Sequence, residues 1–440
     1  MGMNKLKLIL LMFLGLAVTS SVYAQDKKKM TVDECVKTGL ENSNFLHSSK
    51  MSMNYAEAKS KEVNTFRLPS LSFGASYTRL SEVNPFILNT PFGVFNIAPS
   101  ILNSYNFKVT LQQPIFTGFR LESNSKIAEY SYEASKEDFN RDRNELVYNI
   151  RNAYWGLFQA NQIKKVTEEN VAQVQAHLTD VQNLFDQGLA TKNDVLKVQV
   201  QLGEAQLRLI DSKNAVQIAN INLDNILGIS LSTEIEPFNN IDKKVKDARE
   251  LSDLLDKAYS RRPELKSMDY KVQASQSGIT AAKSDWWPQL YLTGNYYYAR
   301  PNQRIQPTQD KFNATWDVSV SMSFNLWNWG ATSDRTDAAE AQFEQAKDGY
   351  KILKDRVTLE VTANYLNINK SEERMTVSEQ SVKQAEENYK VTDEKFKNGL
   401  ALNSDLLDAE VALLQAKTNY IQSVVDYELA LAQLKKSIGE

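Results

Sequence analysis

Four segments of the chain alternate between apolar and polar residues, as β-strands with one apolar face do. In the clearest segment, Trp316, Val318 and Val320 alternate with Asp317 and Ser319. The alternation predicts strands at about 69–80, 105–116, 286–299 and 315–328. Each has about the length of a tilted membrane strand. A soluble sheet with one wet face shows the same alternation, but its wet face usually carries charges. Here the polar positions are mostly Ser, Thr, Asn and Gln, which favours membrane strands.

Two long tracts without proline follow the strand pairs. No proline lies between 114 and 237 or after 307, and proline inside a helix costs about 3 kcal/mol. Each tract is interrupted by a glycine suited to end a helix, Gly188 in the first and Gly399 in the second. We therefore expect two helical hairpins, with arms at about 121–186 and 192–227, and at 332–397 and 403–438. They could form an extended coiled coil or the wall of a helical tube.

The two hairpins are copies of one another. Residues 184–228 match residues 395–439 without a gap at an offset of 211, so that Phe185 corresponds to Phe396 and Gly228 to Gly439. A repeat of this length is a duplicated half-protein, since solenoid repeats have periods of a few dozen residues.

The N-terminus has the features of a secretory signal peptide, predicted at 1–24. Lys5 and Lys7 precede an apolar run at 8–18, and Val22-Tyr23-Ala24 is a suitable cleavage site. The run is too short for a membrane-spanning helix.

Four strands cannot close a barrel, and lipid does not tolerate open sheet edges, so the chain must oligomerise. The connections 81–104 and 300–315 fit the extracellular side.

The composition argues against several classes of protein. A net charge of −3 gives no basic field for nucleic acid. The single cysteine, Cys35, and the two histidines make a metal site improbable, and no catalytic motif is present. We expect no enzyme activity, no cofactor and no bound metal. Cys35 is predicted to be a small core residue, and His47 and His177 to be surface residues of helices.

Several short motifs stand in register across both halves. They are Met30-Thr31-Val32-Asp33-Glu34-Cys35-Val36, Leu68-Pro69-Ser70-Leu71, Trp287-Pro288-Gln289-Leu290, Pro114-Ile115-Phe116-Thr117-Gly118 and the two F-x-x-G-L-A-x-x-x-D segments at the hairpin tips. Together with the order of the predicted elements, these motifs resemble the TolC-like outer-membrane efflux protein family. The resemblance implies an α+β membrane protein with internal duplication. Its homotrimer would form a twelve-stranded β-barrel, four strands per chain, in the outer membrane. A long twelve-helix barrel would continue it across the periplasm.

The resemblance also implies a function and partners. Such channels export small molecules from an inner-membrane pump through a periplasmic adaptor protein. The expected organisation is a signal peptide at 1–24, a first repeat at 25–228, an equatorial linker at 229–250 and a second repeat at 251–440. A duct for type I protein secretion is the alternative within this class. A secreted coiled-coil structural protein is the alternative outside it.

The second hairpin tip carries two aspartates one helical turn apart, Asp405 and Asp408. In a trimer they would form two rings of carboxylates that select cations, and the resemblance gives these positions the role of the periplasmic gate. Alternatively, they are ordinary acidic residues of a first helical turn, as is Asp194 in the first tip. The first tip has Lys197 where the second has Asp408, so the acidic pair is confined to one hairpin.

The family's gate lock is not conserved in this chain. Where a Tyr and an Arg would bond an Asp of the first tip, this sequence has Phe396 and Ala401 opposite Asp194. Closure would then depend on other contacts, such as packing of Phe185 and Phe396, which could equally be hairpin core. The resemblance also implies that the exposed tips contact the adaptor. These residues are Gly188, Leu189, Gly399 and Leu400; the alternative is ordinary helix capping.

Overall fold

The computed structural model describes residues 28–84, 86–98, 100–238 and 250–440. The predicted signal peptide and residues 239–249 of the predicted linker lie outside these ranges. The chain divides into two compact units. Unit one comprises the described residues of Met1–Asn44, Leu146–Ala248 and Leu366–Leu434, and unit two those of Phe45–Glu145, Arg249–Tyr365 and Lys435–Glu440. Each unit takes segments from both sequence halves, so the repeat does not correspond to two spatial domains.

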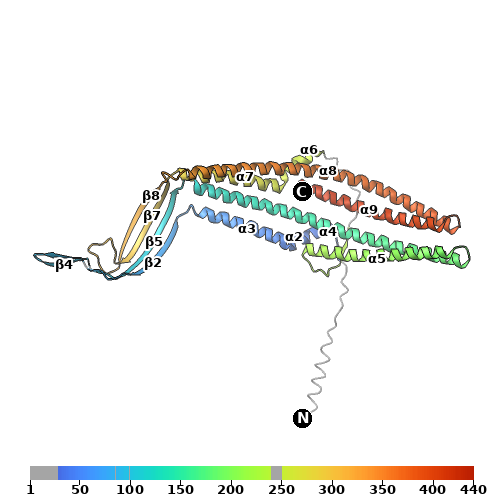
Figure 1. Cartoon of the computed structure of the whole chain (residues 1–440), viewed down its shortest axis with the longest axis horizontal. Coiled ribbons are helices and arrows are strands. Elements are labelled where there is room, and N and C mark those ends of the chain that lie inside the picture. The colour runs from blue at the N-terminus through green and yellow to red at the C-terminus, as the bar shows by residue number, and fades with distance from the viewer. Residues whose placement is uncertain (1–27, 85, 99, 239–249) are drawn as a thin grey trace, which may run out of the picture. The chain divides into compact units, whose positions relative to one another are not determined.

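Unit two contains a four-stranded antiparallel sheet (Figure 1). Its strands, in spatial order, are β2 (Ser70–Arg79), β5 (Asn103–Phe116), β7 (Gln289–Arg300) and β8 (Asn313–Ser323). These are the four strands that the alternating segments predict. In the described chain, β2 and β8 are the edge strands, each with one side unpaired.

The strand register extends the alternation across the whole sheet. One row of paired residues is apolar in all four strands: Phe73, Val109, Tyr296 and Trp316. The neighbouring row is polar in all four: Ser72, Thr110, Asn295 and Asp317. Within it, the Thr110 hydroxyl donates to Asn295 Oδ1 at 3.0 Å, and Asn295 Nδ2 donates to Asp317 Oδ1 at 2.8 Å. The sheet therefore has one apolar face and one hydrogen-bonded polar face.

Two predicted strand ends are wrong. β7 begins at Gln289, because Trp286 belongs to a 3-10 helix, η1 (Lys283–Trp286), and Pro288 has no N–H to donate to a neighbouring strand. β8 ends at Ser323, which pairs with Gln289, so β7 offers no partner for residues 324–328. Trp327 and Trp329 contact each other in the connection that follows, with 5.8 Å between ring centroids.

A second, two-stranded hairpin was not predicted. It lies in the connection between β2 and β5 and consists of β3 (Phe86–Thr90) and β4 (Gly93–Ala98). Three prolines in this connection, at 85, 91 and 99, favour a loop in the sequence. Pro91 lies in the turn between the strands, where it removes no ladder hydrogen bond.

The long helices agree with their predicted bounds to within one residue. They are α4 (Arg120–Asp186), α5 (Lys192–Leu227), α8 (Ala331–Lys397) and α9 (Asn403–Ser437). Both ends of α4 and the start of α5 are separated from their counterparts by the sequence offset of 211. Among the described helices, none combines the length and apolar composition of a membrane span.

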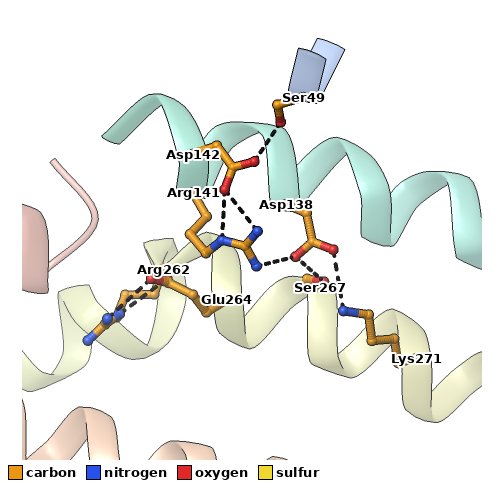
Figure 2. Close-up of polar contacts among 8 residues, drawn as sticks. All are labelled: Ser49, Asp138, Arg141, Asp142, Arg262, Glu264, Ser267 and Lys271. Atoms are coloured by element: carbon orange, nitrogen blue, oxygen red, sulfur yellow. Dashed lines mark hydrogen bonds and ion pairs between the residues drawn. The ribbon is translucent and has the colours of Figure 1, made fainter. Parts of the chain in front are cut away.

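Polar contacts connect three helices of unit two, α3 (Asn44–Thr65), α4 and α7 (Pro263–Ala282). Figure 2 shows Arg141 of α4 between Asp138 and Asp142, with ion-pair distances of 2.9 and 2.8 Å. Ser267 of α7 donates to Asp138 at 3.0 Å, and Ser49 of α3 donates to Asp142 at 2.6 Å. Because each carboxylate binds both the guanidinium and another helix, the network fixes the register of the three helices.

A buried arginine marks the start of α7, after α6 (Leu251–Arg261). Arg262 forms ion pairs with Glu264 at 3.3 Å and with Glu360 of α8 at 2.7 Å. Its side chain is 7% exposed, so these two partners offset the cost of burying the guanidinium.

The N-terminal segment of unit one is held against α4 and α5. The short strand β1 (Lys28–Met30) pairs in parallel with β6 (Ile235–Pro237), and α2 (Val32–Asn42) follows. The buried Tyr154 hydroxyl donates to the Met30 carbonyl at 3.1 Å. Gly39 of α2 lies so close to α4 that a Cβ there would be 2.5 Å from Ile150 Cδ1. Cys35 is fully buried, which confirms its predicted core position.

Candidate gate at the helical hairpin tips

Both hairpin tips turn in the same way. Gly188 and Gly399 have φ of +76° and +69°, the left-handed conformation that glycine adopts without strain. Leu189 N–H donates to the Leu184 carbonyl at 2.8 Å, and Leu400 N–H donates to the Lys395 carbonyl at 2.8 Å. This is the Schellman pattern of helix termination. It leaves Leu189 and Leu400 as exposed apolar points, 72% and 78% exposed.

The helices that follow the two turns are capped differently. In the first tip, Thr191 and Asp194 form a complete capping box at the start of α5. The hydroxyl and N–H of Thr191 lower the pKa of Asp194 below its ordinary value. The second tip has Leu402 at the capping position, so only the Asp405 carboxylate contributes, accepting the Leu402 N–H at 3.1 Å. Helix capping therefore explains why an acidic residue occurs at Asp194, and it explains in part why one occurs at Asp405.

Asp405 and Asp408 lie one turn apart on the exposed side of α9. The opposite side of the same turns is buried, with Leu406, Ala409 and Glu410 each at most 2% exposed. The structure thus places the two carboxylates together on the solvent side of one helix. Lys197 is exposed at the corresponding position of α5.

Phe396 and Ala401, at the lock positions, belong to an apolar cluster. Phe396 is 8% exposed, and Ala401 and Phe185 pack against the same cluster between the hairpins. The buried members of this cluster are Val174, Val181, Val195, Val198, Phe396 and Leu406. Within one chain, apolar packing therefore connects the two tips. One polar contact accompanies it, from Asn403 Nδ2 to the Asp194 carbonyl at 3.5 Å.

A buried ionisable pair lies beside this cluster, and the sequence did not predict it. His177 of α4 is 4% exposed, so the expectation of a surface position was wrong, whereas His47 is exposed. Its Nδ1 lies 3.3 Å from Oε1 of Glu410 on α9, which is 1% exposed. The His177 ring contacts Phe396 edge to face, with 5.2 Å between centroids. Burial and the carboxylates of Asp393 and Glu410 raise the pKa of Tyr389 to about 12.

Helical spacing would have revealed the burial of both residues. His177 follows Val174 by three positions and precedes Val181 by four, which places all three side chains on one face. Glu410 follows Leu406 by four positions and precedes Leu413 by three, which likewise places it on an apolar face. The sequence therefore contains a signal that both titratable side chains are buried, because each lies on the apolar face of its helix.

Unit one buries a second carboxylate away from the tips. Asp224 near the end of α5 is fully buried, and burial raises its pKa to about 6. Its Oδ2 accepts a hydrogen bond from Asn220 at 2.9 Å. Asn220 in turn donates to the Thr233 carbonyl at 2.6 Å and accepts the Ile235 N–H at 2.9 Å. Asp224 therefore orients the side chain that attaches β6 to α5.

A family model described as outer membrane efflux protein matches residues 36–229 and 254–440, which include nearly all of both repeats. The chain belongs to this family. The resemblance inferred from the motifs is confirmed, and membership indicates the outer membrane as its location and a channel protein as its class.

Known relatives are similar along most of the chain. TolC of Escherichia coli is 21% identical over 406 residues, spanning 90% of this chain and 79% of TolC. The outer membrane efflux protein BepC of Brucella suis is 22% identical, spanning 79% of this chain and 76% of BepC. The alkaline protease secretion protein AprF of Pseudomonas aeruginosa is 25% identical, spanning 77% and 70%.

Solved structures show the same fold. CusC has a TM-score of 0.80 at 15% identity, covering 93% of this chain and 92% of CusC. The outer membrane protein VceC of Vibrio cholerae has a TM-score of 0.79 at 16% identity, covering 93% and 96%. The combination of a strand region and long helical hairpins is therefore a property of this fold.

Proposed function

We propose that this protein is the outer-membrane channel of a tripartite efflux system that exports small molecules. Three copies would form a twelve-stranded barrel continued by a periplasmic tunnel of twelve helices. A periplasmic adaptor would join this tunnel to an inner-membrane pump. The observation that carries the proposal is the four-stranded sheet with one apolar face, one polar face and two unpaired edges.

The edges of the sheet argue for assembly from several copies. An unpaired strand edge in lipid leaves N–H and C=O groups without partners, which costs several kcal/mol per group. Because the strands alternate in direction, β8 of one copy can pair with β2 of the next in the antiparallel sense. The apolar row would then face lipid, where Phe73 and Trp316, 68% and 70% exposed in one chain, become covered. The Thr110–Asn295–Asp317 row would line the lumen.

The helices of unit one have two open sides that suit the same assembly. α4 contacts α9 through the His177–Glu410 pair and a 3.3 Å ion pair between Lys417 and Glu169. Exposed apolar residues lie on the two other helices. On α5 they include Leu196, Val200, Leu207, Ile210, Ile218 and Ile221, and on α8 they include Leu366, Val377 and Val391. We infer that α5 of one copy packs against α8 of the next. In this arrangement 25–228 and 251–440 act as equivalent repeats, and 229–250 belongs to a collar.

The gate is assigned to the hairpin tips. With Asp405 and Asp408 on the solvent side of α9, a trimer would bring six carboxylates around its axis, and such rings attract cations. Closure would rest on the Phe396 cluster and on the buried His177–Glu410 pair, since Phe396 and Ala401 cannot form a polar lock. The exposed points Leu189 and Leu400, with Gly188 and Gly399 setting their turns, would contact the adaptor.

A protein-secretion duct is the second candidate, favoured by the similarity to AprF, a protease secretion protein. Deleting the gene in its own host distinguishes the two. Efflux predicts greater sensitivity to small toxic compounds with an unchanged set of secreted proteins, whereas secretion predicts the reverse. Sensitivity restored by the wild-type gene would support efflux, and an unchanged sensitivity profile would contradict it.

The assembly is tested separately by the mass of the purified protein in detergent and by heat-modifiable migration of the outer-membrane fraction. A trimeric mass is expected. A stable monomer in the soluble fraction would instead favour a secreted coiled-coil protein.

A further inference from the structure

The connection between β2 and β5 has an unusual composition. No charged residue occurs between Glu82 and Lys108. The equivalent connection between β7 and β8 is charged, containing Arg304, Asp310 and Lys311. Asp310 forms an ion pair with Arg300 at 2.8 Å, as expected of a loop in water. The two connections, equivalent in the repeat, are therefore suited to different surroundings.

The β3–β4 hairpin in this connection exposes apolar residues on both faces. Ile87 and Leu88 are consecutive in the regularly paired part of β3 and are 46% and 47% exposed, although neighbouring residues of a strand point to opposite faces. Phe86, before a register shift in the same strand, is 63% exposed. Val94 of β4 is 70% exposed. A hairpin lying in water, or docked on a protein through one face, would keep one face polar. Apolar residues on both faces suit surroundings that are apolar on both sides.

The turn of the hairpin presents an aromatic residue. Phe92 is 94% exposed. The Thr90 hydroxyl donates to the Gly93 carbonyl at 3.0 Å and accepts the Phe92 N–H at 3.3 Å, and Gly93 has a φ of +139° that glycine tolerates. The turn is thus held by its own hydrogen bonds with Phe92 at its apex.

The chain connectivity places the hairpin at the end of the sheet that lies away from the long helices. β2 follows α3 and β5 precedes α4, so the connection between β2 and β5 lies at the end of the strands away from these helices. In the proposed trimer this end emerges at the outer surface of the membrane. The inference below rests on that proposed placement of the sheet.

We propose that the β3–β4 hairpin is a lipid-binding element that inserts into the interfacial region of the outer leaflet beside the barrel. Its uncharged sequence avoids the cost of burying a charge, and Phe and Leu are among the residues with which peripheral proteins enter the boundary between head groups and acyl chains. The outer edges of a two-stranded hairpin keep unpaired backbone groups, which exclude it from the hydrocarbon centre and confine it to the hydrated interface. The partner is therefore a lipid surface.

The test uses the full-length assembled protein in phosphatidylcholine vesicles that contain a lipid with a nitroxide near the head group. Phe92→Cys is labelled with an environment-sensitive fluorophore; the native Cys35 is fully buried and stays unlabelled in the folded protein. Gln303→Cys, exposed in the charged connection, is the matched control. We expect a blue-shifted emission at position 92 that lipid nitroxide quenches at least about threefold more than at position 303. Aqueous iodide should show the opposite preference.

Two results would overturn the lipid-binding proposal, and a third would show that the sheet itself is not in the membrane. Equal iodide quenching at positions 92 and 303 would place the hairpin in water and overturn the proposal. A blue shift without nitroxide quenching, with cross-linking between Phe92→Cys copies, would identify a second copy as the partner and also overturn it. A label at Val318→Cys, on the apolar face of β8, reports on the sheet itself. If nitroxide lipid fails to quench that label, the membrane placement of the sheet is what failed.

Discussion

His177 on α4 and Glu410 on α9 place their side chains 3.3 Å apart in a part of the chain that excludes water. The pair joins the first hairpin to the second, beside Phe396. The distance is that of an ion pair, but the geometry is not that of a hydrogen bond, and each of the two side chains has buried polar atoms without a hydrogen-bond partner. The pair is thus a polar connection between hairpins that lies inside the helix packing, away from the tip.

Replacing either residue of this pair should loosen the two hairpins. His177→Leu and Glu410→Leu should each lower the free energy of unfolding by about 1–3 kcal/mol, because the remaining polar group stays buried with no polar side chain facing it. The double variant should recover much of this loss. Thermal melting with Gln175→Leu, at an exposed position of α4, as control measures the effect. Additive losses in the double variant would mean that the two residues do not interact.

The same variants test closure of the channel. In planar bilayers the single variants should open more often than the wild type at equal protein amount, since the contact that joins the hairpins is lost. An unchanged open probability would show that the pair contributes to stability alone.

The carboxylates on α9 should determine the response to divalent cations. Replacing Asp405 and Asp408 with Ala should weaken block of the channel current by divalent cations about tenfold or more, because the proposed trimer would lose its ring of negative charge. Asp334→Ala, in the first turn of α8, is the control for loss of an ordinary acidic residue. Block as strong as in the wild type would remove the gate assignment.

Burial of Asp224 makes stability depend on pH. The unfolded chain releases this proton near pH 4, whereas the folded protein releases it at about 6. Between these values the folded state binds more protons, so stability falls as pH rises from about 4 to about 6 and is level above. Asp224→Asn should abolish this dependence and raise stability at pH 8 by on the order of 1–2 kcal/mol. Melting temperatures at pH 5 and pH 8, with the exposed Asp211→Asn as control, measure it.

The close approach of α2 to α4 depends on Gly39. Gly39→Val should destabilise unit one by about 1–3 kcal/mol, since its side chain would overlap Ile150. Gly156→Ala is the matched control, because a Cβ there meets no atom within 4 Å, and alanine stabilises a helix relative to glycine. A melting temperature unchanged by Gly39→Val would mean that α2 can move away from α4 without loss of stability.

The sequence was sufficient for features with a regular period. Alternation located the four strands, and the absence of proline located helices such as α4 and α8 to within one residue. It failed where a local chemical detail overrides the period, as at Pro288, which delays the start of β7. It also failed at the β3–β4 hairpin, because apolar residues on both faces produce no alternation.

The candidate site was predicted unevenly. The Gly188 and Gly399 turns follow from glycine alone, and so they were predictable. The pairing of His177 with Glu410 is a contact between residues distant in sequence, so helical spacing could indicate their burial but could not name the partner. The orientation of Asp405 and Asp408 toward a common axis depends on neighbouring copies and stays a prediction.

The composition of the two compact units affects how the chain can be made. Unit one needs residues up to Leu434, and unit two needs Lys435–Glu440, so neither can be completed from the first half of the polypeptide. Each unit can therefore be completed only after the last segment of the chain has been made. The duplicated halves are thus not two independently folding domains, and a fragment that ends after the first repeat would contain neither unit whole.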